Sequence, residues 1–298
     1  MSLQSQEIDR VRIRKPEWLK ISVPGGETTA RIRQVMRTKG LHTVCEEARC
    51  PNMAECWGAG TATFMILGDI CTRSCGFCAV KTGRPAQLDS AEPGRVADAV
   101  QAMGVRHAVI TSVNRDELPD GGAAVFAETV RQVRKVNQGI TVEVLIPDFR
   151  GVLDAVDLVI DAGPDVLNHN VETVPRLYET VRPQAKYQRS LDVLNHARLR
   201  GMVTKTGMML GLGEQREEVL DVVKDLRAID CQVLTLGQYL QPTHEHLPVS
   251  RYLPPSEFDD LRQQALDRGF RFVEAGPLVR SSYHAEKHVL SSTVDQGI

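Results

Sequence analysis

The chain has 298 residues, 42% of them hydrophobic, so it is long enough to bury a large core as one domain or slightly more. Its 36 basic and 38 acidic residues give a formal net charge of −2, which argues against bulk electrostatic attraction to nucleic acids or membranes. No apolar run reaches the length of a membrane span, and seven cysteines without a secretory signal indicate metal binding rather than disulfides.

The N-terminal part of the chain is polar and basic. Residues 1–16 lack the apolar centre of a signal peptide, and a helix is expected over residues 28–39, ended by Gly40. From Asp9 to Gly40 there are nine Lys or Arg residues and three Asp or Glu residues. We interpret this stretch as a solvated face, and docking of an acidic partner domain is a second hypothesis.

A first group of cysteines, which we call the Cys45 triplet, consists of Cys45, Cys50 and Cys56 in a C-x4-C-x5-C spacing. Three thiolates leave one coordination position of a metal centre open, or filled from elsewhere in the chain. A probable strand separates this group from the next cysteines, so we expect two metal sites rather than one shared site.

A second group, the Cys71 triplet, has a C-x3-C-x2-C spacing: Cys71, Cys75 and Cys78. On a four-iron, four-sulfur cube, three thiolates leave one iron without a protein ligand, and that iron can bind substrate. A zinc knuckle is the alternative, but structural zinc prefers four closed ligands and Ala79 follows the last cysteine. Phe77 is expected to shield the cluster and to meet a flat ligand ring.

From residue 61 onwards the pattern alternates between strands and helices. Strands are expected over 61–67, 107–112, 142–146, 165–171, 203–210 and 232–236, with helices such as 123–136, 191–199 and 217–228 between them. Six strand–helix units in a row indicate a parallel sheet. A cysteine loop, rather than a glycine-rich nucleotide motif, follows the first strand. Because polar residues also gather at the carboxyl ends of strands, we expect an α/β fold with a partial (β/α)6 TIM-like barrel rather than an open doubly wound sheet.

Three parts are therefore expected along the chain. Residues 1–58 form an N-terminal extension that carries the first cysteines, residues 59–242 form the barrel, and residues 243–298 form a C-terminal extension. Within the last part, a helix is expected near 255–268 and a short strand over 270–274.

The spacing of the Cys71 triplet resembles that of the radical S-adenosylmethionine superfamily. Both triplets together with Arg280-Ser281-Ser282-Tyr283 resemble the lipoyl synthase family within it. Further matching segments run through nearly the whole chain: Cys45-Glu-Glu-Ala-Arg-Cys50-Pro-Asn52, Thr111-Ser-Val-Asn-Arg-Asp-Glu-Leu-Pro-Asp-Gly-Gly122, Asn168-His-Asn-Val-Glu-Thr173, Met209-Leu-Gly-Leu-Gly-Glu214 and Gly237-Gln-Tyr-Leu-Gln-Pro242.

The resemblance implies a sulfurtransferase of lipoate biosynthesis. Such an enzyme inserts two sulfur atoms, at C6 and C8 of an octanoyl chain linked to a lysine of a lipoyl carrier domain, and uses two molecules of S-adenosylmethionine. The Cys71 triplet would hold the radical-generating cluster, whose open iron binds S-adenosylmethionine. The Cys45 triplet would hold a second, auxiliary four-iron, four-sulfur cluster that donates sulfur and is consumed, with Ser282 as its fourth ligand. Capping of a turn is the commoner role of paired serines.

Polar residues at the ends of strands are the candidates for binding S-adenosylmethionine. Asn170 and Glu172 are expected to share one face by strand alternation and to bond its ribose and methionine portions. Arg182 and Lys205 are candidates for its carboxylate. The alternative for each is an ordinary satisfied polar group of the barrel interior. Residues at the end of the second strand are also expected to line the cofactor: Thr111, Ser112 and Asn114.

Two other functions are alternatives: a radical methylthiotransferase acting on transfer RNA, and an electron carrier with two clusters. The near-neutral charge argues against the first and the three-ligand sites against the second. The expected partners are an octanoylated lipoyl carrier domain of a dehydrogenase E2 subunit or a glycine cleavage H protein, an electron donor such as ferredoxin or flavodoxin, and a cluster-repair carrier. Neither nucleic acid nor membrane is an expected partner, and the expected location is the cytoplasm.

Overall fold

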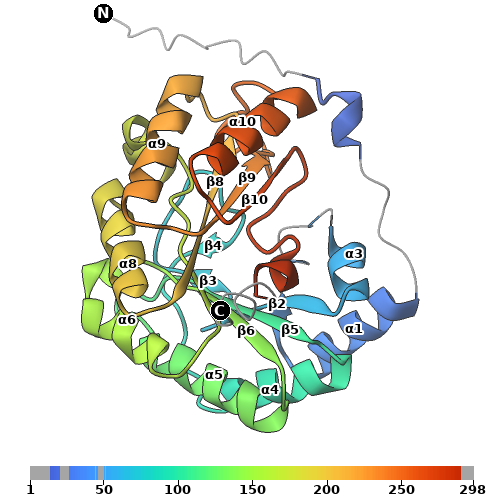
Figure 1. Cartoon of the computed structure of the whole chain (residues 1–298). Coiled ribbons are helices and arrows are strands. Elements are labelled where there is room, and N and C mark those ends of the chain that lie inside the picture. Colours follow the sequence, from blue (N-terminus) through green and yellow to red (C-terminus); the bar gives the residue numbers. More distant parts are fainter. Residues whose placement is uncertain (1–13, 21–26, 44, 46–49, 51, 290–298) are drawn as a thin grey trace, which may run out of the picture.

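The structure, a computed structural model, describes residues 14–20, 27–43, 45, 50 and 52–289. Figure 1 shows a curved sheet with helices along its outer side. The strands are β1 (His42–Thr43), β2 (Thr61–Ile66), β3 (Ile70–Cys71), β4 (Lys81–Thr82), β5 (His107–Ser112), β6 (Thr141–Leu145), β7 (Val166–Asn168), β8 (Val203–Leu210), β9 (Val233–Gln238) and β10 (Phe272–Gly276).

Helices alternate with these strands in most of the chain. They are η1 (Glu17–Leu19), α1 (Glu27–Thr38), α3 (Met53–Gly58), α4 (Glu92–Met103), α5 (Ala123–Val136), η2 (Phe149–Gly151), α6 (Leu153–Ile160), η3 (Pro175–Leu177), α7 (Tyr178–Val181), α8 (Tyr187–Leu199), α9 (Arg216–Ala228), α10 (Pro255–Asp267) and η4 (Ala285–His288).

The main sheet has the order β1-β2-β5-β6-β7-β8-β9-β10, and β1 alone pairs antiparallel within the part of the chain that the structure describes. The strands from β2 to β10 are parallel and follow one another in chain order. This confirms the predicted α/β partial barrel. Since the strands run the same way, their carboxyl ends and following loops meet at one edge.

The C-terminal strand extends this sheet beyond the six predicted strands. β10 pairs in parallel with β9, Phe272 lying opposite Val233, and α10 packs on β10. The segment after residue 242 thus adds one more helix and one more strand to the barrel. The long connection before α10 interrupts the regular alternation, so the sequence pattern did not assign them to the sheet. The functional division at residues 58 and 242 remains a proposal, since the sheet itself continues past it.

The predicted boundaries hold closely for β5, β8 and α5, but the fourth predicted strand is too long. β7 ends at Asn168 instead of residue 171. Glu172 has a left-handed backbone with φ of 65° and makes only an isolated bridge to Met208. The chain therefore turns at the edge of the sheet, where the site residues lie.

Two apolar clusters fill the space between the sheet and its helices. One contains Phe64, Ile110 and Phe126, and the other contains Leu194, Leu210 and Phe258. Cys231 is fully buried at the start of β9, as predicted. No helix within the described residues is long and apolar enough to cross a membrane.

Candidate functional site

The Cys71 triplet lies on the loop that follows β2. Cys71 ends β3, which pairs with β4 on the far side of the loop, and the Cys78 backbone N–H donates to the Cys75 carbonyl at 3.0 Å. All three are free cysteines; Cys71 is buried and the other two are half-buried. The loop therefore stands at the carboxyl edge of the sheet, where barrel enzymes place their chemistry.

The thiols of this triplet are neighbours on one loop and influence one another's pKa. Burial raises the pKa of Cys75, and it raises the pKa of Cys78 to about 11, with Cys71 acting in the same direction on both. Among the described residues, no three His, Cys, Asp or Glu side chains are close enough together to hold a single metal ion. Three thiols on one loop can hold a four-iron, four-sulfur cluster, in which each thiolate binds a different iron.

The loop is tied to the end of β5. Both the backbone N–H and the hydroxyl of Thr72 donate to the Asn114 carbonyl at 3.0 Å. The Asn114 N–H donates to the Cys71 Sγ at 3.3 Å, and the Asp116 N–H donates to the Thr72 hydroxyl at 3.1 Å. Asn114 thus contacts the first cysteine through its backbone, which leaves its side chain free for a ligand.

Arg73, inside the cysteine motif, is buried in a paired charge network. It donates to both carboxylate oxygens of Asp116 at 2.7 and 2.8 Å, and to Asp148 Oδ1 at 2.6 Å. Arg189 donates to the other oxygen of Asp148 at 3.1 Å. Burial would raise the pKa of Asp148, but Arg73 holds it well below its usual range. Two cations and two carboxylates therefore compensate each other beside the loop.

The other side of the loop contacts later parts of the chain. The Gly76 N–H donates to the Val181 carbonyl at 2.9 Å, and the Gly76 carbonyl accepts from the Leu247 N–H at 3.0 Å. A Cβ at Gly76 would lie 2.8 Å from the Leu247 side chain, so a larger residue would force that side chain to move. His246 Nε2 lies 2.9 Å from the Cys78 carbonyl oxygen, so this histidine supports the loop backbone.

Several buried polar atoms among the candidates have no hydrogen-bond partner within the described residues. They are Ser112 Oγ, Asn114 Oδ1, Asn170 Oδ1 and Arg182 Nε. Because buried polar atoms are normally satisfied, these fit a polar ligand that bonds them. The donor and acceptor mixture suits the ribose and the amino acid portion of S-adenosylmethionine.

Asn170, Glu172 and Arg182 lie together next to this loop. Asn170 Nδ2 donates to Glu172 Oε1 at 3.1 Å, and Arg182 Nη1 donates to the Asn170 carbonyl at 2.9 Å. The predicted reason, strand alternation, is wrong because β7 has ended; the backbone turn at Glu172 brings the side chains together instead. Burial raises the pKa of Glu172, and the positive charge of Arg182 opposes this rise. Arg182 likewise opposes the rise that burial causes in the pKa of Cys75.

Two other candidates have satisfied polar groups inside the barrel. Thr111 donates to the Leu145 carbonyl at 2.9 Å. Lys205 donates to Glu143 Oε2 at 2.9 Å, and both side chains are fully buried. Its ammonium is thus paired within the sheet rather than open at the barrel mouth, which weakens its predicted contact with a cofactor carboxylate. Phe77 is half-buried in the loop itself.

The Cys45 triplet forms a second group of neighbouring thiols. Burial raises the pKa of Cys45 and of Cys56 to about 12, and the Cys50 thiol acts in the same direction on both. The Cys50 N–H donates to the Cys45 carbonyl at 2.9 Å, and the Cys56 N–H donates to the Asn52 carbonyl at 2.9 Å in α3. Such thiols are neutral until a metal centre displaces their protons.

A segment from the other end of the chain closes this second group. Asn52 Nδ2 donates to the Leu278 carbonyl at 2.7 Å across a separation of 226 residues. The Tyr283 hydroxyl donates to Glu55 Oε1 at 3.1 Å, and His284 Nε2 lies 3.2 Å from the same oxygen. The C-terminal segment is therefore anchored to both ends of the Cys50–Cys56 interval.

Ser282 lies between these anchors and is half-buried. Arg280, two residues before it, lowers the pKa of Cys50 against the effect of burial. Tyr283, one residue after it, contacts Glu55 beside Cys56. The fold thus brings the predicted serine segment to the cysteines it is predicted to join; ligation by its oxygen stays a prediction.

Two arginines that sequence reasoning left without a role belong to these sites. Arg73 stands within the second cysteine motif and Arg280 begins the Arg-Ser-Ser segment. Their positions could have indicated this role, because each arginine lies within a sequence motif that contains predicted metal ligands. Their partners, such as Asp148, lie far away in sequence and carry no such signal.

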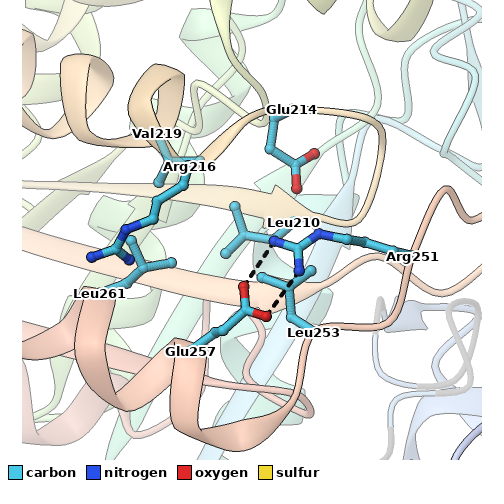
Figure 2. A pocket seen from close by; sticks show the side chains of 8 residues that line it. All are labelled: Leu210, Glu214, Arg216, Val219, Arg251, Leu253, Glu257 and Leu261. Carbon is cyan, nitrogen blue, oxygen red and sulfur yellow. Dashed lines mark hydrogen bonds and ion pairs between the residues drawn. The ribbon is translucent and has the colours of Figure 1, made fainter.

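A small pocket between β8, α9 and α10 lies apart from both groups of cysteines. Figure 2 shows Arg251 and Glu257 joined in a two-bonded ion pair at 2.8 and 2.9 Å across it. None of the predicted site residues is among those that line it. Its lining is already paired, so it is not a candidate for the chemistry.

Comparison with family models gives two matches. Residues 65–226 match the model of the radical SAM superfamily. Residues 2–50 match the model described as the N-terminal domain of lipoyl synthase of the radical SAM family. The first range contains the Cys71 triplet, and the second contains Cys45 and Cys50.

Curated relatives match almost the whole chain. A lipoyl synthase of Rubrobacter xylanophilus is 60% identical over 281 residues, which cover 94% of this chain and 88% of the relative. A lipoyl synthase of Bacteroides thetaiotaomicron is 52% identical, covering 93% and 99%. One of Bacillus cereus is 56% identical, covering 94% and 95%.

Solved structures show the same fold at low identity. SuiB of Streptococcus suis bound to precursor peptide SuiA matches with a TM-score of 0.57 and 11% identity over 83% of this chain and 52% of that chain. HydG, a maturase of the [FeFe]-hydrogenase, matches with a TM-score of 0.54 and 14% identity, covering 89% and 72%. These likenesses concern the fold alone.

Proposed function

This chain belongs to the lipoyl synthase family of radical S-adenosylmethionine enzymes, and we propose that its two cysteine triplets hold two clusters with separate tasks. The family's reaction is the insertion of two sulfur atoms, at C6 and C8 of an octanoyl group carried by a lipoyl carrier domain. The observation that carries the division of tasks is that the fold builds two distinct groups of free thiols, each from different elements.

When bound, S-adenosylmethionine and the two clusters supply the radical that removes hydrogen from carbon and the sulfur that replaces it. In this proposal the three thiols of the Cys71 triplet hold the first cluster and leave one iron open for S-adenosylmethionine. The paired charges of Arg73 fix the loop without adding net charge, and Phe77 covers the cluster from within the loop.

The cofactor-binding residues in this proposal are those with unsatisfied polar atoms near the loop. The Ser112 hydroxyl and the Asn114 and Asn170 amide oxygens would accept hydrogen bonds from the ribose or amino groups. Glu172, which already accepts from Asn170, would also accept from the amino group, and the unsatisfied Arg182 Nε would donate to the carboxylate. Thr111 and Lys205 support the strands behind them.

The Cys45 triplet, in this proposal, holds the auxiliary cluster, and the Ser282 oxygen is its fourth ligand. The contacts of Asn52 and Glu55 with the C-terminal segment support this arrangement, because they keep that segment against the thiols. The Ser282 oxygen would be the more easily released ligand, because an alkoxide can be reprotonated more readily than a thiolate, and this would suit a cluster that supplies sulfur.

Family membership decides among the functions that the sequence left open, since an electron carrier and a transfer RNA methylthiotransferase are different families. The choice of carrier domain, E2 subunit or H protein, remains a proposal. So do ferredoxin or flavodoxin as the electron donor, a cluster-repair carrier and a cytoplasmic location. The basic N-terminal stretch, proposed to dock the carrier, lies partly outside the described residues.

The experiment that tests this function is anaerobic reconstitution followed by turnover. The chain should bind about eight irons, and with S-adenosylmethionine and a reductant it should add two sulfur atoms to an octanoylated carrier peptide, detected by mass. A count of about four irons would remove one of the two sites. Formation of 5′-deoxyadenosine without any gain of sulfur would remove the sulfur-donor assignment.

A further inference from the structure

Arg280 is a half-buried cation beside the Cys45 triplet that has no carboxylate partner within the described residues. Its Nη1 donates to the carbonyl oxygens of Val279 at 2.6 Å and Gln238 at 3.4 Å. Carbonyl oxygens orient a guanidinium but do not neutralise it. A buried charge without a counter-charge is costly, and it is retained where a bound anion compensates it.

The backbone around Arg280 is built to hold it in place. A Cβ at Gly237 of β9 would lie 2.2 Å from the Val279 carbonyl oxygen and 3.5 Å from Arg280 Nη1, so glycine is required for this approach. Two residues before Arg280, the Leu278 carbonyl accepts from Asn52 between the second and third cysteines. The position of the guanidinium is thus fixed from the sheet on one side and from the cysteine segment on the other.

The titratable neighbour of Arg280 is the Cys50 thiol, whose pKa Arg280 lowers against the effect of burial. The two act on each other electrostatically, and no carboxylate of the described residues does so at Arg280. Arg73 at the first triplet is the opposite case, since Asp116 and Asp148 take up its charge. Of these two arginines, Arg280 alone has no carboxylate among the described residues, so its charge is available to whatever the thiols of the Cys45 triplet bind.

We propose that Arg280 supplies the positive charge that stabilises the auxiliary cluster, which three thiolates and a serine oxygen leave net negative. This proposal rests on the function proposed above for the Cys45 triplet. Removal of the charge should make reduction of that cluster harder, because reduction adds a further negative charge. It should also weaken the hold on iron, because the thiolates then repel one another without compensation.

The test uses the full chain with Cys71, Cys75 and Cys78 replaced by Ala, so that the auxiliary cluster is the only one present. In this background we compare native Arg280 with Arg280→Gln and Arg280→Lys. The readouts are a redox titration followed by electron paramagnetic resonance, and the rate of iron transfer to a chelator. Arg280→Gln should shift the potential to more negative values and release iron roughly three- to tenfold faster, while Arg280→Lys should stay close to native.

Arg268→Gln is the matched control, because Arg268 also bonds only to oxygens of neighbouring residues, but at the exposed end of α10 away from the thiols. It should change neither readout. An unchanged potential and iron release in Arg280→Gln would overturn the proposal. If neither Arg280→Gln nor Arg280→Lys binds iron, the proposal is also overturned, because Arg280→Lys keeps the positive charge and the shape of the side chain would then be what matters. If Arg280→Gln alone fails to bind iron, the proposal is supported. If the background with native Arg280 binds no iron, the function proposed for the Cys45 triplet is itself wrong.

Discussion

The Cys71 triplet is held by loops of consecutive strands, whereas the Cys45 triplet is closed by a segment from the opposite end of the chain. At the first, the Arg73 and Asp148 side chains are 3% and 0% exposed and form a closed network of charges. At the second, the Glu55 carboxylate that holds Tyr283 and His284 has a side chain that is 57% exposed. The Cys71 triplet is thus held by buried side chains, whereas part of what closes the Cys45 triplet is an exposed carboxylate.

This difference matches the two tasks that we propose for the triplets. A cluster that is used repeatedly benefits from a rigid loop, and buried paired charges in a network provide it. A cluster that is consumed must be replaced after turnover, so its ligands have to be reached again. The contacts of Glu55 with Tyr283 and His284 are exposed and weak enough to open, since solvent screens them. We therefore expect changes at the two sites to have different consequences.

The largest expected effect comes from removing each set of thiols. Replacement of Cys71, Cys75 and Cys78 by Ala should abolish cleavage of S-adenosylmethionine, because no iron then binds it. Replacement of Cys45, Cys50 and Cys56 by Ala should leave some cleavage but stop sulfur insertion. Chromatography of 5′-deoxyadenosine and mass analysis of the carrier peptide measure the two steps. Lipoyl product from the second variant would show that the two sites do not divide the work in this way.

The next largest effect should come from Asp148→Ala beside the first site. It leaves Arg73 and Arg189 without their shared carboxylate in a buried place, which typically destabilises a protein by about 3–5 kcal/mol. The loss should appear in denaturant unfolding and as reduced iron at the Cys71 triplet.

Glu55→Gln is the matched change at the second site, where a carboxylate also holds two partners but is exposed. It should cost less than about 1 kcal/mol of unfolding free energy and leave the iron of the Cys71 triplet intact. Equal losses of unfolding free energy and of iron for Asp148→Ala and Glu55→Gln would contradict the contrast between a buried and an exposed anchor.

A smaller and more specific effect is expected at the fourth ligand of the auxiliary cluster. Ser282→Cys should keep the cluster, because a thiolate binds iron well, but should slow or stop sulfur insertion, because the thiolate does not let go. Ser281→Ala should be milder, and cleavage at the Cys71 triplet should survive both. Iron content and product formation, measured side by side, separate retention from release. Normal product from Ser282→Cys would show that a labile oxygen ligand is not needed.

The sequence predicted the fold and the cysteine chemistry because both have local signals. Alternating strands and helices, and the spacing of thiols, can be recognised within short windows. The seventh parallel strand was missed as part of the sheet because its pairing with β9 is not local. Lys205 looked available for the same reason, since its partner Glu143 lies 62 residues away.

Side-chain pairs that depend on a turn were also beyond the sequence. Asn170 and Glu172 meet because the backbone leaves the strand and Glu172 adopts a positive φ, not because they share a face. Ser282 could be assigned to the Cys45 triplet only through the family resemblance. Nothing in the spacing predicted that Asn52 and Glu55 reach the segment around it.

The last expected effect is a pH dependence of stability to which the Cys71 side contributes. His169 is buried beside that network, with Nδ1 2.9 Å from the Ile146 carbonyl oxygen and Nε2 3.0 Å from the Ser190 hydroxyl, contacts that suit a neutral ring. Burial lowers its pKa to about 4. Between pH of about 6.5 and about 4, His169 is protonated in the unfolded chain but stays neutral in the folded chain. The free energy of unfolding therefore falls as the pH falls, by at most about 1.4 kcal/mol per pH unit. His169→Gln should make this slope shallower in denaturant titrations, while His244→Gln, at an exposed position, should leave it unchanged. The remaining slope comes from His107 and His288, because burial lowers their pKa values to about 3 and about 2. An unchanged slope in His169→Gln would show that His169 does not contribute to the acid sensitivity.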